Sequence, residues 1–102
     1  MQPINVDFKD LVNSVADQFT SDTGMPVNPL ARDKLIFRAL PYKEKVETEI
    51  ASGTISIEFL RQSIRTVLEN ARKVAEDWGR TAVGEDTTEE SIKRDCPYLF
   101  WC

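Results

Sequence analysis

The side chains of this sequence that could do chemistry are carboxylates and thiols, because the 102-residue chain contains no histidine. The lack of histidine excludes Ser-His and Cys-His catalytic pairs, zinc sites with histidine ligands and a histidine pH switch. The two thiols, Cys96 and Cys102, are too few to complete a tetrahedral zinc site. Cys96 follows Asp95 at the end of a predicted short helix, where a reactive thiolate is disfavoured. We therefore expect no thiol catalysis and no bound zinc.

Two acidic motifs have the residue types of catalytic or metal sites. The Asp-Thr-Gly triplet at residues 22–24 matches the active-site triplet of aspartic proteases, in which two aspartates share a proton. Here the triplet follows a helical apolar pattern, so we interpret it as the turn that ends a helix. The acidic run at residues 85–90 lacks the alternating oxygen ligands and the glycine of a calcium loop. We interpret it as a helix start with a capping box formed by Thr87 and Glu90.

Two aromatic residues, Phe37 and Tyr42, interrupt the densest basic stretch and could stack on nucleic-acid bases. The basic residues are Arg32, Lys34, Arg38, Lys43 and Lys45. The helical period assigns both aromatic side chains to the core, however, and the chain carries a net charge of −4. Nucleic acid is therefore not expected as a partner. No catalytic residue, metal ligand or cofactor motif is predicted, and we expect the protein not to be an enzyme.

Apolar residues recur at helical spacing along most of the chain. This periodicity predicts helices over residues 8–19, 29–40, 42–50, 57–82 and 88–95. The pattern is strongest over 57–82, where apolar residues alternate by three and four positions through three heptads. The predicted fold is all-α: four to five helices pack around one long central helix, about residues 57–82, in a single helical domain over residues 1–102. We expect five side chains on the inner face of this long helix to be almost fully buried: Leu60, Ile64, Val67, Ala71 and Val74.

The C-terminal aromatic residues are the strongest candidates for an interaction site. Three of the nine aromatic residues lie in the stretch Tyr98-Leu99-Phe100-Trp101. Chain ends are usually polar, so such a stretch either folds back into a groove of the core or anchors the chain to a partner or a second subunit. The sequence leaves both alternatives open. The candidate interaction residues are Tyr98, Leu99, Phe100, Trp101 and, at the end of the long helix, Trp78.

These observations indicate a small soluble, non-enzymatic interaction or regulatory protein. One alternative is an acidic protein that binds and regulates or neutralises a basic partner, because both ends of the chain are acidic. Another alternative is an accessory subunit of a larger enzyme assembly. A protein partner or a homodimer is expected, because the apolar stripe of the long helix is wider than three shorter helices can cover.

The expected location is the cytoplasm. No apolar run approaches the 18–20 residues or so that span a bilayer, and the first residues lack the basic and apolar regions of a signal peptide. Two cysteines in 102 residues are too few for a disulfide scaffold. We therefore expect neither a membrane nor an oxidising compartment.

Overall fold

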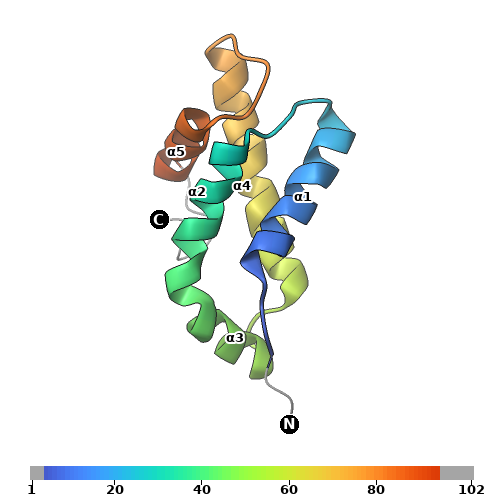
Figure 1. Ribbon diagram of the computed structural model, residues 1–102, viewed down its shortest axis with the longest axis vertical. Coiled ribbons are helices and arrows are strands. Elements are labelled where there is room, and N and C mark those ends of the chain that lie inside the picture. The colour runs from blue at the N-terminus through green and yellow to red at the C-terminus, as the bar shows by residue number, and fades with distance from the viewer. Residues whose placement is uncertain (1–3, 95–102) are drawn as a thin grey trace.

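The computed structural model describes residues 4–94, which contain five α-helices and one 3₁₀ helix joined by short loops (Figure 1). They are α1 (Phe8–Thr23), α2 (Pro29–Ala39), η1 (Leu40–Tyr42), α3 (Lys43–Ala51), α4 (Ile57–Asp77) and α5 (Glu85–Arg94). No strand occurs in this part of the chain, so the predicted all-α fold is confirmed. The predicted interaction residues Tyr98, Leu99, Phe100 and Trp101, and both cysteines, lie outside the described residues.

Local side-chain chemistry defines where several helices begin and end. Asp7, Asn28 and Ser56 each precede a helix, and their side-chain oxygens accept backbone N–H groups of the first turn at 2.9–3.1 Å. The Asp-Thr-Gly triplet ends α1, because Gly24 adopts the left-handed conformation with φ of 75°. The interpretation of this triplet as a helix-ending turn is confirmed.

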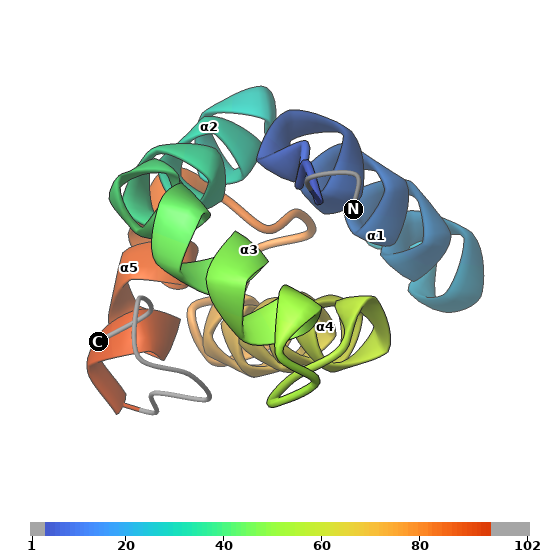
Figure 2. The same cartoon turned by 90° about the horizontal axis from the view of Figure 1, so that it is seen from below.

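Four of the helices form a closed ring, which Figure 2 shows end-on. α4 packs against α1 and α5, and α2 completes the ring because it packs against the same two helices on the other side. α3 follows α2 through η1 and crosses the lower end of the ring (Figures 1 and 2). No described helix is long and apolar enough to cross a membrane.

α4 is shorter than the sequence predicted. It has 21 residues and ends at Asp77 rather than at residue 82. Gly79 is the reason for the early end: its φ of 71° is left-handed and turns the chain away from the helix axis. The predicted inner face is confirmed, because five α4 side chains are fully buried or nearly so: Leu60, Ile64, Val67, Ala71 and Val74.

α5 begins earlier than the sequence predicted, at Glu85 rather than residue 88. A parallel bridge between Val27 and Val83 joins the two loops ahead of α2 and α5, and it fixes the chain directly before the α5 start. The predicted capping box is wrong, because Thr87 lies inside the helix and its hydroxyl donates to the carbonyl of Gly84 at 3.0 Å. Further along α5, the buried Ser91 hydroxyl donates to the Val67 carbonyl of α4 at 2.9 Å.

Candidate functional site

α2 buries one leucine and two alanines on its core side and leaves a second leucine and its phenylalanine exposed to solvent. Ala31, Leu35 and Ala39 are fully buried. Leu30 and Phe37 are 58% and 69% exposed. The prediction that Phe37 belongs to the core is therefore wrong, and α2 carries an apolar stripe that the ring of helices does not cover.

Close helix packing explains this arrangement. Consecutive residues of a helix are about 100° apart around its axis, so Phe37 projects about 200° from Leu35. α2 has neighbours on two sides, α1 and α5, and the two alanines allow their backbones to approach it. Tyr42 was also predicted to be buried and is 39% exposed, because Pro41 converts the chain into a 3₁₀ turn and breaks the helical register.

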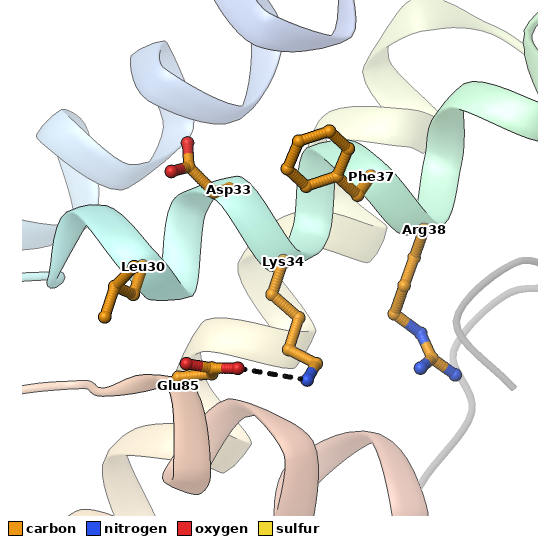
Figure 3. A pocket seen from close by; sticks show the side chains of 6 residues that line it. All are labelled: Leu30, Asp33, Lys34, Phe37, Arg38 and Glu85. Carbon is orange, nitrogen blue, oxygen red and sulfur yellow. Dashed lines mark hydrogen bonds and ion pairs between the residues drawn. The ribbon is translucent and has the colours of Figure 1, made fainter.

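A shallow pocket of about 400 Å³ lies on the outer face of α2, beside the start of α5 (Figure 3). Its α2 residues are spaced by 0, 3, 4, 7 and 8 positions, which places them on one side of the helix. We call this region the α2 surface; its residues are Leu30, Asp33, Lys34, Phe37, Arg38 and Glu85. It combines an exposed aromatic and an exposed aliphatic side chain with charges of both signs.

Ion pairs hold the polar side of the α2 surface in place. The ammonium group of Lys34 lies 2.7 Å from Glu89 and 3.5 Å from Glu85, as Figure 3 shows for Glu85. The hydrogen bond with Glu89 raises the pKa of Lys34 and lowers the pKa of Glu89. Asp33 is exposed and takes part in no ion pair among residues 4–94. Lys34 therefore docks α2 on α5, whereas Asp33 is available to a group from outside.

Trp78, the one predicted interaction residue that the structure describes, lies at the end of α4 and is 44% exposed. The Arg80 guanidinium lies over its ring, 5.3 Å from the centroid, and also pairs with Asp86. Arg80 and Asp86 line a second hollow of about 420 Å³, which shares Lys34 and Glu85 with the α2 surface. Trp78 is therefore connected to the edge of the α2 surface through Arg80.

The other charged motifs are occupied by contacts within the chain. In the acidic run at residues 85–90, the partners of Glu85, Asp86 and Glu89 are Lys34 and Arg80. Within residues 4–94, no group of three potential ligands is placed to hold a metal ion. These carboxylates consequently stabilise the contact of α5 with α2 and with the loop before it.

Basic side chains of the stretch at residues 32–45 also pair with carboxylates in different parts of the molecule. Arg32 donates to Asp17 of α1 at 2.8 Å, and Lys43 pairs with Glu47 one helical turn further on in α3. Its charges therefore do not form one continuous basic face.

Comparisons with protein families, with curated proteins and with solved structures found no match to this chain. The geometry of the α2 surface is consequently the main guide to function. Sequence reasoning missed Leu30 as a functional candidate and assigned Phe37 to the core. The spacing of Ala31, Leu35 and Ala39 by four residues was the signal that could have identified the buried side of α2.

Proposed function

We propose that this protein is a non-enzymatic interaction protein that binds another protein chain through the α2 surface. One observation carries the proposal: Leu30 and Phe37, two helical turns apart on the same face, are mostly exposed beside a pocket. Neighbouring exposed apolar side chains with a polar rim are typical of protein-binding sites. Phe37 and Arg38 also belong to the residue types that are enriched at such interfaces.

The two alternatives have weaker support. A protein that neutralises a basic partner needs carboxylates free to meet it, and Glu85, Asp86 and Glu89 already have basic partners within the chain. The charges that line the α2 surface also sum to zero, with two acidic and two basic side chains. An accessory subunit would bind its enzyme through an exposed surface of the same kind. The experiment below distinguishes this alternative by the identity of the captured protein.

The test is affinity capture from a native extract with three forms of the full chain. The first is the wild type, and the second carries Leu30→Ser and Phe37→Ser. The third carries Ile4→Ser and Ile57→Ser, which remove two exposed apolar side chains outside the α2 surface. Circular dichroism first establishes that all three forms have the same helix content.

We expect the wild type and the control to retain the same protein, and the α2 variant to lose it. Any protein retained in this way must re-form the complex when both components are purified, with affinity at least about tenfold weaker for the α2 variant. A retained enzyme would favour the accessory-subunit alternative. Equal retention by all three forms would show that the α2 surface is not the binding site.

A further inference from the structure

α2 and α5 leave the same point of the fold and run side by side in the same direction. Val27 and Val83 form a parallel bridge, and each helix begins two residues after its bridge residue, at Pro29 and at Glu85. The two helices then pack against each other, and Figure 3 shows α5 continuing from Glu85 alongside α2 toward Arg38. The last turn of α5 therefore lies beside the later turns of α2.

Charge contacts indicate which turns of the two helices face each other. Lys34 pairs with Glu89, in the second turn of α5. The pKa of Glu89 is lowered mainly by Lys34 and also by the charge of Arg38, one turn further along α2. α5 continues for five more residues and ends at Arg94. The chain consequently leaves α5 near the far end of the α2 surface, where Phe37 and Arg38 lie.

The residues that follow α5 are long enough to reach the α2 surface and match the spacing of its exposed apolar side chains. Tyr98 comes four residues after the end of α5. Four extended residues span about 13 Å, whereas the axes of packed helices lie about 8–10 Å apart. Residues 98–101 span about 10 Å when extended, and Leu30 and Phe37 are separated by about 10.5 Å along the α2 axis.

The chemistry of this part of the sequence also fits the α2 surface. The four residues 98–101 are Tyr, Leu, Phe and Trp, which can cover the exposed leucine and phenylalanine of α2. Asp95 is the one charged side chain among residues 95–102, and its charge is opposite to that of Arg38. Pro97 favours an extended chain immediately before the aromatic residues.

We propose that residues 98–101 cover the α2 surface of their own chain, with Tyr98 against Phe37 and Trp101 against Leu30, and that a partner must displace them. This inference rests on the proposed function, because it concerns the regulation of the same site. A short tether gives the residues an effective concentration in the millimolar range, while a contact with two exposed side chains is weak. The covered and open forms therefore have comparable populations, and the cover adds little stability.

Photocrosslinking in the full chain tests where residues 98–101 lie. p-Benzoylphenylalanine replaces Phe37 in one variant, Leu30 in a second, and the exposed Ile57 outside the α2 surface in a control. Each variant is mixed with isotope-labelled wild-type chain, so mass spectrometry separates crosslinks within one chain from crosslinks between copies. We expect crosslinks within one chain from position 37 to residues 98–99 and from position 30 to residues 100–101, and none from the control position to these four residues.

Three results would contradict this placement. Crosslinks from position 37 that reach only a second copy would make that copy the occupant. The lack of any crosslink to residues 98–101 would reject the cover. Crosslinks from position 37 to residues 100–101, with position 30 reaching residues 98–99, would overturn the proposed direction.

A peptide added in trans tests the competition. The probe is a fluorescein-labelled peptide with the sequence of residues 95–102, under reducing conditions. In a full-length variant, serine replaces all four residues 98–101, so the α2 surface stays open. We expect this variant to bind the peptide about twofold more tightly than the wild type in fluorescence anisotropy, because only about half of the wild-type chains are open. Further substitution with Leu30→Ser and Phe37→Ser should abolish binding, whereas further substitution with Ile57→Ser should not. Equal affinity of the wild type and the open variant would overturn the competition.

The failure of this inference is distinguishable from the failure of the proposed function. If no crosslink to residues 98–101 forms but the Leu30/Phe37 variant loses a captured protein, the proposed function stands and the cover is rejected. If the crosslinks form but all three forms of the chain capture the same proteins equally, the proposed function fails, and so does the regulatory role of the cover.

Discussion

Truncation of α2 at Leu35 and at Phe37 measures directly which side of this helix belongs to the core. Leu35→Ala removes a fully buried side chain, and such changes cost about 2–5 kcal/mol. Phe37 is 69% exposed, so only about a third of its side chain is covered. Full burial of a phenylalanine contributes about 1.5–3 kcal/mol, which leaves roughly 0.5–1 kcal/mol for Phe37. The better helix propensity of alanine offsets about 0.5 kcal/mol of that loss, so Phe37→Ala is expected to be nearly neutral.

Urea denaturation followed by far-ultraviolet circular dichroism is the assay. The protein is kept at low concentration, because self-association would add stability to the folded state. With a denaturant slope of about 1.5 kcal/mol/M, a loss of 3 kcal/mol lowers the midpoint by about 2 M. We expect a shift of this size for Leu35→Ala and a shift below about 0.3 M for Phe37→Ala. If Phe37→Ala shifts the midpoint as much as Leu35→Ala does, α2 is rotated and the α2 surface is part of the core.

Three further predictions concern other elements. Val67→Asp buries a carboxylate in the fully buried stripe of α4 and is expected to lower stability by several kcal/mol; an unchanged thermal melt would contradict this. Gly24→Ala forces a left-handed residue at the end of α1 and should cost about 1 kcal/mol in urea denaturation, whereas no loss would mean that α1 ends differently. Hydrogen bonds from Lys43 and from the Val6 N–H lower the pKa of Glu47, so its stabilising effect is complete above its ordinary value of 4.5 and is lost as the pH falls through the lowered pKa. Glu47→Gln should therefore lower the melting temperature at neutral pH and have little effect in strong acid, and an equal effect at both would refute this.

The core of α4 could be predicted because its signal is local and repeated. Leu60, Ile64 and Val67 follow one another by four and three residues, and the pattern continues for two further turns. A long stripe of this kind has one orientation that buries it. The turn at residues 22–24 was equally predictable, because Gly24 ends α1 whatever packs around it.

The start of α5 depends on a contact between distant parts of the chain, and the sequence did not reveal it. Two backbone hydrogen bonds form the bridge between Val27 and Val83. The N–H of Asn28 donates to the Val83 carbonyl at 2.8 Å, and the N–H of Val83 donates to the Pro26 carbonyl at 2.9 Å. These bonds hold the chain immediately before α5, so the helix begins at Glu85. A local capping pattern such as Thr87 with Glu90 cannot compete with them.

The two faces of α2 show why the candidate site was harder to predict than the core. A sequence pattern ranks positions by the size of their apolar side chains, so Phe37 ranks above Ala31 and Ala39. In a ring of four helices, however, α2 must approach α1 and α5 closely, and alanine permits a shorter distance between helix axes than phenylalanine does. The buried side is consequently selected by the neighbouring helices, which lie far away in the sequence. Phe37 lies on the opposite side of α2 and is 69% exposed, and an exposed aromatic side chain beside other apolar residues is the kind of feature that marks an interaction site.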